Sequence, residues 1–287
     1  MPELPEAETI ARQLHRELAG KTLGRVALMR PDIVHGDDGL LDSLLPRRRV
    51  KRVWRRAKRV QIELTGDVRL VFRLGMTGRL GVGPADLPLE KHTHLRIAVE
   101  GTTHELRFCD PRRFGGLWIL TARDDDPDGK LGLEPLDATP GQFRAALSRR
   151  RQIKALLMDQ SAVAGLGNIY CDESLYAARI HPLTRAARLD REAVVRLLRA
   201  IKRTLRRAIR FNGSTLMDYR DADGREGSFQ KLHRVYQREG HPCRTCRTPI
   251  RRILAAGRST FFCPKCQRRG RSKPLHDCRG SDRMRQR

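Results

Sequence analysis

Four cysteines near the end of the sequence have the spacing of a metal site. Cys243 and Cys246 form one C-x-x-C pair, and Cys263 and Cys266 form a second after sixteen intervening residues. Thiolates at this spacing are typical of tetrahedral zinc, and four sulfur ligands leave no position open for a reactive water. The sequence therefore predicts one structural Zn²⁺. Disulfides are the alternative, disfavoured by an odd total of seven cysteines.

The start of the sequence offers a nucleophile. Removal of the initiator methionine would leave the secondary amine of Pro2 as the chain terminus. An α-amino group has a pKa of about 8, against about 10.4 for lysine, so more of it is free base at neutral pH. Such an amine condenses with an aldehyde-level carbon, and the neighbouring Glu3 could act there as a general acid. The alternative is a rigid, solvated lead-in to the first helix.

The composition favours a polyanionic partner. The 287 residues include 59 Lys and Arg against 33 Asp and Glu, a formal net charge of +26. Nucleic acid fits that excess better than a membrane surface, because the sequence has no long apolar run and no signal-peptide pattern. We therefore expect a cytoplasmic protein, in which thiols stay reduced. Cys109, Cys171 and Cys278 lie outside the ligand spacing and are interpreted as ordinary thiols.

Hydrophobic periodicity indicates which elements must position these groups. Apolar residues recur at helical spacing over residues 7–19, and Gly20 ends that pattern. Short β-branched runs separated by tight-turn sequences follow, which indicates a β-sandwich of mainly antiparallel strands. Segment 123–141 is acidic, rich in Pro and Gly and aperiodic, so it marks a domain boundary.

Beyond this boundary the pattern is helical. The longest predicted helix begins at the N-cap Asp190, and its polar face, within “RLLRAIKRTLRRAIR”, is heavily basic. We predict an α+β protein in four parts. A β-sandwich domain with flanking helices occupies 1–130, a helical domain 131–235, a zinc ribbon 236–268 and a basic disordered tail 269–287.

Six motifs then occur in a recognisable order. They are “PELPE” at the terminus, “RRAK” at 55–58, “LGMTG” at 74–78, “DPRRFG” at 110–115, “GLGNIYCDE” at 165–173 and the four-cysteine module. Together they resemble the formamidopyrimidine-DNA glycosylase family, bifunctional base-excision enzymes for oxidised purines, over the chain from Pro2 to Gln267. The resemblance implies a helix-two-turns-helix domain, and a monomer that acts on duplex DNA carrying oxidised bases or abasic sites.

The resemblance also implies roles for individual residues in the chemistry. Pro2 corresponds to the nucleophile that displaces the damaged base and holds the sugar as a Schiff base. Glu3 corresponds to the proton donor that opens the sugar ring. Lys58 corresponds to the lysine of the elimination steps. Arg258 corresponds to the arginine of the zinc hairpin that grips the phosphates flanking the lesion, although by spacing alone it would be an ordinary surface arginine.

Other positions correspond to groups that contact DNA. Three of them match side chains that fill the gap left by a flipped nucleotide: Met76, Arg112 and Phe114. Core packing is the alternative for Met76 and Phe114. The remaining matches share the pocket or contact the DNA: Glu6, His92, Arg149, Lys154 and Asn168. The polar, glycine-bearing segment 213–233 corresponds to a loop that closes over flipped 8-oxoguanine; the alternative is a disordered connector.

Two positions depart from the family pattern, and two other functions remain open. Arg73 stands where the family usually has histidine, and Gln237 where it usually has glycine; we expect effects on lesion preference or phosphate binding. An endonuclease VIII-like glycosylase for oxidised pyrimidines is one alternative function, although Leu4 differs from the “PEGPE” of that branch. A non-catalytic zinc-ribbon DNA-binding protein is the other.

Overall fold

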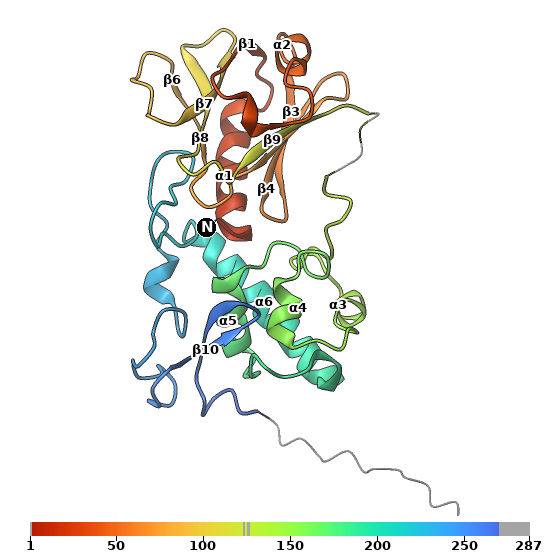
Figure 1. Cartoon of the computed structure of the whole chain (residues 1–287), viewed down its shortest axis with the longest axis vertical. Helices are drawn as coiled ribbons and strands as arrows, with labels where there is room; N and C mark the ends of the chain where they lie inside the picture. The colour runs from red at the N-terminus through yellow and green to blue at the C-terminus, as the bar shows by residue number, and fades with distance from the viewer. Residues whose placement is uncertain (1, 123, 125–126, 270–287) are drawn as a thin grey trace, which may run out of the picture.

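The computed structural model describes residues 2–122, 124 and 127–269 (Figure 1). Two sheets and the first helix form one end of the molecule, and four helices with a small β-ribbon form the other. This arrangement confirms the predicted α+β class. Cys278 and the predicted tail, apart from residue 269, lie outside the described residues. None of the described helices has the length and apolarity that a membrane span requires.

The N-terminal part contains two sheets that share one hydrophobic core. A four-stranded antiparallel sheet has the order β1-β7-β8-β6, and a five-stranded sheet has the order β2-β9-β5-β4-β3, in which only β2 and β9 are parallel. Alternating side chains of these strands meet in the core, as the strand periodicity requires. The strands are β1 (Leu23–Leu28), β2 (Val34–His35), β3 (Val50–Arg56), β4 (Arg59–Leu64), β5 (Arg69–Arg73), β6 (Arg79–Pro84), β7 (Thr93–Val99), β8 (His104–Cys109) and β9 (Gly116–Leu120).

Helix α1 (Leu4–Leu18) begins almost at the terminus and connects the two halves of the molecule. A capping box between Glu3 and Glu6 fixes its first turn, where each side chain accepts a backbone N–H of the other residue. The later positions Leu14 and Leu18 enter the core of the two sheets, whereas Leu4 packs in the helical core. The terminus is therefore held at the junction of both parts. A short helix, α2 (Leu40–Leu44), and a 3₁₀ turn, η1 (Pro31–Ile33), complete the N-terminal part.

The helical part is built around α5 and α6. Asp190 caps α6 as predicted, since its carboxylate accepts the backbone N–H of Ala193 at 2.7 Å. One face of α6 is apolar and packs on α1, α3 and α5. The elements are α3 (Pro140–Ala146), α4 (Ile153–Met158), α5 (Asn168–Ala177), η2 (Ala186–Arg188), α6 (Arg191–Arg210) and η3 (Phe229–Leu232).

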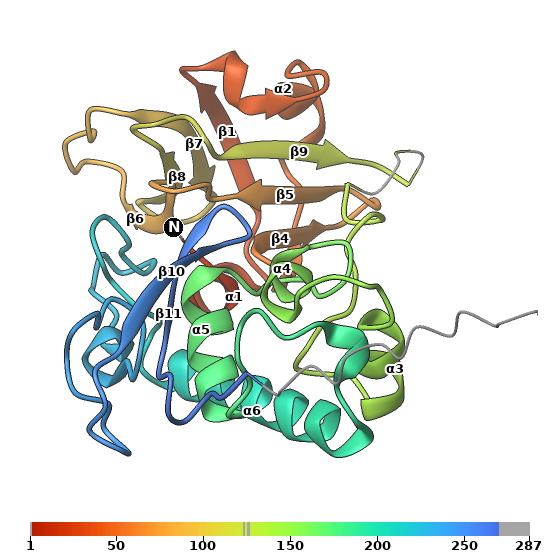
Figure 2. The same cartoon turned by 60° about the horizontal axis from the view of Figure 1, so that its bottom comes forward.

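A two-stranded antiparallel ribbon of β10 (Arg251–Ala255) and β11 (Arg258–Phe262) follows. Figure 2 shows it alongside α5, which β11 contacts. Its small core includes two of the ligand cysteines, and Tyr176 of α5 packs into it.

Segment 213–233 lies against the N-terminal part. Tyr219 is buried in the core of the two sheets, and the Ala222 backbone N–H donates to the Gln13 side chain at 3.0 Å. The Gln13 amide in turn donates to Asp221 at 2.9 Å. These contacts give the segment a defined conformation, so the alternative of a disordered connector is wrong.

Candidate active site and metal centre

The N-terminus of α5 holds the Glu3 carboxylate. Backbone N–H groups of Gly167, Ile169 and Tyr170 donate to it at 2.8, 3.0 and 3.4 Å. A helix N-terminus favours a negative charge, because its first N–H groups have no partners within the helix. Glu3 is only 2% exposed, and Pro2, directly before it, is also buried. The predicted proton donor Glu3 is therefore fixed by a helix far along the chain.

Glu6 accepts the backbone N–H of Glu3 and is fully buried. Its carboxylate accepts the backbone N–H groups of Glu3 and Ser214, both at 2.8 Å, and the hydroxyl of Tyr170. Burial raises the pKa of Glu6 to about 7, and the nearby charge of Glu3 acts in the same direction. The Ser214 hydroxyl also contacts His233 Nε2 at 3.1 Å. Glu6 thus connects the first turn of α1 to Ser214, whose hydroxyl in turn reaches His233 at the other end of segment 213–233.

Lys58 belongs to the same electrostatic environment. It lies in the tight turn between β3 and β4, where Ala57 adopts a positive φ of 53°. Burial lowers the pKa of Lys58, whereas the charges of Glu3 and Glu6 raise it. A lysine with a lowered pKa is a better proton acceptor near neutral pH. Glu3 and Glu6 therefore contribute to the electrostatic environment of Lys58.

The turn that carries Lys58 is held by Glu134 of the helical part. The Glu134 carboxylate accepts the Ala57 backbone N–H at 2.6 Å and pairs with Arg55 and Arg56, each at 2.9 Å. Arg55 also pairs with Glu8 of α1 at 2.9 Å. The sequence analysis missed Glu134, and no motif spacing marks it. One carboxylate thus connects the β3–β4 turn to the other half of the molecule.

The “LGMTG” and “DPRRFG” segments form neighbouring loops with exposed tips. Met76 is 38% and Phe114 50% exposed, so core packing does not account for them. The Arg112 guanidinium lies 4.8 Å from the centre of the Phe114 ring. A Cβ at Gly75 would lie 2.5 Å from the Phe114 carbonyl carbon, so only glycine allows these loops to approach. The three predicted gap-filling side chains therefore lie on adjacent loops.

Asp110 stabilises the second of these loops. It is fully buried and accepts the Gly115 backbone N–H at 2.7 Å as well as the Thr77 hydroxyl. His92, another predicted contact, is exposed beside it, and its carbonyl accepts the Asp110 backbone N–H at 3.1 Å. The sequence motif contained Asp110, but its role as the anchor of two loops follows only from the structure.

The other predicted contacts differ in their surroundings. Arg149 is exposed, with its guanidinium 3.4 Å from the Asp159 carboxylate. Arg258 is exposed at the start of β11. Asn168 Nδ2 donates to the Ser259 carbonyl at 2.9 Å, which fixes the hairpin against the first residue of α5. Arg149 and Arg258 are therefore exposed, although Arg149 also pairs with Asp159, whereas Asn168 positions the hairpin.

Lys154 requires a correction. The sequence predicted a direct DNA contact, but its side chain is completely buried and its ammonium pairs with Asp172 at 2.6 Å. The second Asp172 oxygen accepts the Phe261 backbone N–H at 2.9 Å. In this conformation the Lys154 ammonium forms an internal ion pair and does not reach the surface. It neutralises the carboxylate that attaches the ribbon to α5.

The four predicted ligand sulfurs converge beneath the ribbon. The Sγ atoms of Cys243, Cys246, Cys263 and Cys266 all lie within 4.8 Å of one another. Cys243 and Cys266 are 3.9 Å apart, and Cys246 and Cys263 are 3.4 Å apart. Tetrahedral zinc with bonds of about 2.3 Å requires sulfur separations of about 3.8 Å, so the arrangement fits this metal. Cys109 and Cys171 are buried elsewhere.

The two departures from the family pattern have visible surroundings. Gln237 has a φ of 55°, a backbone conformation that is unfavourable for any residue with a side chain. This conformation explains why the family usually has glycine at this position. Arg73 is exposed at the end of β5, with its guanidinium 5.5 Å from the centre of the Trp118 ring.

Three family profiles match successive parts of the chain. The formamidopyrimidine-DNA glycosylase N-terminal domain matches residues 1–117, and the H2TH domain of the same enzymes matches 131–220. A zinc finger found in FPG and IleRS matches 240–269. The chain is 45% identical to the formamidopyrimidine-DNA glycosylase of Herpetosiphon aurantiacus, over 93% of this chain and all of the relative. The chain belongs to the formamidopyrimidine-DNA glycosylase family.

Other members support the assignment. The Thermus thermophilus formamidopyrimidine-DNA glycosylase is 43% identical over 94% of this chain and its own full length. A Lactococcus lactis FPG mutant bound to Fapy-dG-containing DNA superposes with a TM-score of 0.86 at 33% identity, covering 93% of this chain and all of that one. The Lactococcus lactis Fpg bound to DNA with an abasic site gives 0.85 with the same identity and coverage.

Membership of the formamidopyrimidine-DNA glycosylase family makes this chain a DNA-repair glycosylase that excises damaged bases, with a zinc-binding module. The alternative of a non-catalytic zinc-ribbon protein is therefore wrong. The resemblance noted from six short motifs is confirmed over nearly the whole chain.

Proposed function

We propose that this enzyme excises oxidised purines, 8-oxoguanine and formamidopyrimidines, from duplex DNA and then cleaves the strand. The observation that carries the proposal is the Glu3 carboxylate, directly after Pro2, held at the N-terminus of α5. Glu3 is fixed by three backbone N–H groups, and its negative charge opposes the lowering of the Lys58 pKa by burial. A neutral amine, a positioned carboxyl and a lysine of lowered pKa are the groups that Schiff-base chemistry on a sugar needs.

The proposed reaction uses these groups in sequence. The Pro2 amine attacks C1′ of the lesion nucleotide, and the bond to the damaged base breaks as the base leaves with the electron pair. Glu3 gives a proton to the ring oxygen, the ring opens and the amine and C1′ form an iminium ion. Loss of a C2′ proton then expels the 3′ phosphate, and a second elimination expels the 5′ phosphate. Lys58 serves these eliminations, and Arg258 grips the flanking phosphates.

The remaining contacts support recognition of a flipped nucleotide. We propose that Met76, Arg112 and Phe114 fill the vacated space in the stack, since all three lie on adjacent loops with exposed apolar tips. His92 and Arg149 would bind phosphate. Segment 213–233 would close over the base, with Glu6 linking it to the terminus through the Ser214 N–H. One Zn²⁺ would hold the ribbon, and a monomer would act on nucleoid DNA in the cytoplasm.

Borohydride trapping tests the proposal, because reduction fixes an iminium ion covalently. Wild-type protein with an untagged terminus should be trapped on duplexes carrying 8-oxoguanine or an abasic site. Pro2→Gly, or retention of an N-terminal tag, should abolish the adduct and change DNA affinity less than about threefold, because many separate cations share the phosphate contacts. Pro46→Gly, at an exposed loop position, is the matched control. An adduct of normal yield from the tagged protein would contradict the mechanism.

Comparing duplexes that carry different lesions tests the substrate class. A Lactococcus lactis FPG has been solved with DNA containing an oxidised pyrimidine. A duplex with an oxidised pyrimidine should therefore be assayed together with the duplexes that carry oxidised purines. Faster release of the oxidised pyrimidine than of 8-oxoguanine would favour the endonuclease VIII-like alternative and overturn the purine assignment.

A further inference from the structure

The solvent face of α6 carries a continuous row of cations. The helix contains seven arginines and Lys202, which together we call the α6 strip. All seven arginines are exposed, and Lys202 is half-buried. Glu192 is the one acidic residue of the helix. From Arg191 to Arg210 the strip extends along a straight axis for about 28 Å, at 1.5 Å per residue.

The strip is not neutralised within the protein. Among residues 2–122, 124 and 127–269, no ion pair is formed by any of its eight cations, although many other arginines pair with carboxylates. Arg199 and Arg203, like Arg203 and Arg207, stand four positions apart, where like charges destabilise a helix. The strip therefore opposes helix stability, which favours a role in binding.

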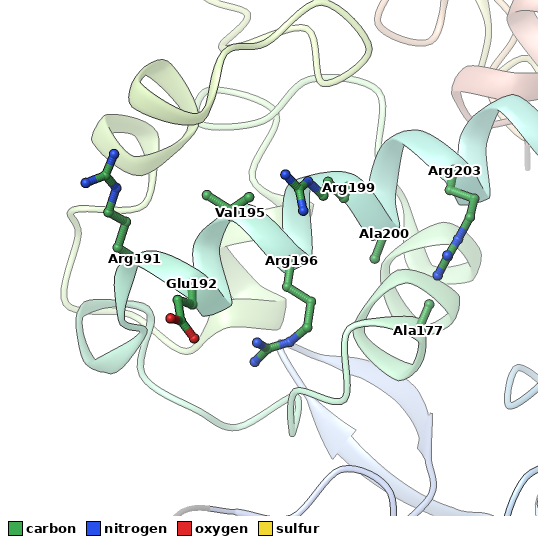
Figure 3. Close-up of a pocket in the computed structure, with 8 residues that line it drawn as sticks. All are labelled: Ala177, Arg191, Glu192, Val195, Arg196, Arg199, Ala200 and Arg203. Carbon is green, nitrogen blue, oxygen red and sulfur yellow. The ribbon is translucent and has the colours of Figure 1, made fainter.

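The cations line two adjoining hollows. The first is bordered by Arg191, Arg196, Arg199 and Arg203, together with Ala177 at the end of α5 (Figure 3). The second continues from Arg199 and Arg203 to Phe211. Because the two hollows share these arginines, they form one surface. The Arg196 Nε also donates to the Ala178 carbonyl at 3.1 Å, which holds this side chain in place.

This surface is separate from the catalytic pocket. Glu3 is bound at the N-terminal end of α5, whereas the first hollow lies at the C-terminal end, about 15 Å further along the helix. The ribbon contacts α5 through Asp172 and Phe261, and α6 packs on α5 through its own apolar face. The strip points away from that apolar face, toward solvent.

We propose that the α6 strip binds the phosphate backbone of a second DNA duplex while the catalytic pocket holds the first. Duplex DNA presents one phosphate per 3.4 Å of each strand, so a 28 Å row of cations spans about eight nucleotides of one strand. Single-stranded nucleic acid is bound with stacked aromatic side chains, and Phe211 is the one aromatic residue along the strip. The centres of protein interfaces are depleted of charged residues, whereas cations border both hollows of the strip.

The inference goes beyond the proposed excision reaction and does not require Schiff-base chemistry. Binding through phosphates alone is independent of sequence and of damage. An enzyme with two such surfaces would bridge two duplexes, or two segments of one long molecule.

A ternary-complex experiment tests this inference. Full-length zinc-loaded protein is first saturated with a short duplex carrying a stable abasic-site analogue. A fluorescent undamaged duplex is then titrated, and its anisotropy is measured at several salt concentrations. Wild type should bind the second duplex. The triple variant Arg199→Gln, Arg203→Gln, Arg206→Gln should bind it at least about tenfold more weakly, with a log–log salt slope smaller by about 2.7, or about 0.9 for each lost phosphate contact.

The control removes the same charge elsewhere. Arg16→Gln, Lys21→Gln, Arg25→Gln changes three exposed cations of the N-terminal part. This variant should capture the second duplex as wild type does, and circular dichroism should show both variants folded. Equal capture by the two variants would overturn the proposal, as would capture of single strands or of polyglutamate in preference to duplex. Failure of the proposed excision would be seen separately, as absence of product from the 8-oxoguanine duplex with all three proteins.

Discussion

Glu3 and Gly167 are 164 residues apart in the sequence, yet the Gly167 backbone N–H donates a 2.8 Å hydrogen bond to the Glu3 carboxylate. A Cβ atom at Gly167 would lie 2.3 Å from the Glu3 carboxyl carbon. The absence of a side chain is therefore what allows the helix N-terminus to hold this carboxylate. The predicted proton donor has its position fixed by a residue of the other half of the molecule.

Gly167→Ala should displace the Glu3 carboxylate and slow base excision. Its φ of −126° is open to alanine, so the effect would be local and steric. A misplacement of about 1 Å can cost about 100-fold in rate. Single-turnover excision of 8-oxoguanine measures the loss, which should exceed any change in DNA affinity. Gly141→Ala, where an added Cβ meets nothing within 4 Å, is the matched control. Unchanged excision by Gly167→Ala would contradict the assigned role of Glu3.

Glu134→Gln should slow strand elimination more than base release. The variant keeps the shape of the side chain but removes the charge that holds Arg55 and Arg56 at the turn carrying Lys58. We expect elimination to fall about tenfold, a moderate positioning effect, while borohydride trapping still reports the Schiff base. Glu63→Gln, which breaks exposed pairs with Lys51 and Arg52, is the control. Equal losses in trapping and elimination would show that Glu134 supports the fold rather than the position of Lys58.

Glu6 should make stability depend on pH. Burial raises its pKa in the folded protein from an ordinary 4.5 to about 7. Its contribution to stability is therefore complete below pH 4.5 and is lost as the pH rises through 7, where the folded state must hold a buried charge. Between pH 5 and 8.5 the free energy of unfolding of wild type should fall by about 2–3 kcal/mol relative to Glu6→Gln, at about 1.4 kcal/mol per pKa unit. Urea denaturation at both pH values measures the difference, and parallel pH profiles would contradict it.

Cys263→Ser should release the metal and weaken binding to all duplexes, damaged or undamaged. Structural zinc supplies folding free energy, so loss of one thiolate should unfold the ribbon that carries Arg258. A colorimetric zinc assay and binding to an undamaged duplex are the measurements. Cys109→Ser, at a buried thiol outside the metal site, is the control. About one equivalent of zinc retained by the ribbon variant would show that the four-cysteine assignment is wrong.

Local patterns in the sequence predicted several parts of the structure. The α6 cap at Asp190, the strands of the first half and the convergence of four cysteines follow from spacing over short distances. The predicted domain limits remain an expectation, and the structure shows why a linear division is difficult. Leu4 packs in the helical core, and Tyr219 packs in the core of the two sheets.

Long-range pairings could not be predicted in the same way. Nothing near Lys154 indicates that Asp172 would neutralise it, and nothing near Glu134 indicates a partner in the β3–β4 turn. Such charges are indistinguishable in sequence from the other acidic and basic residues of a highly charged chain. Fully buried pairs of this kind depend on packing, and only the structure reveals them.

The long-range hydrogen bonds of Glu3 and Glu6 also have a consequence for biosynthesis. Residues 2–6 are synthesised well before the groups that fix Glu3 and Glu6, which belong to Gly167, Tyr170 and Ser214. Contacts of such sequence separation form late, because most of the chain must exist before they can close. A nascent N-terminal half would have strands and a hydrophobic core but no organised pocket. A truncated translation product would therefore lack the contacts that fix Glu3 and Glu6.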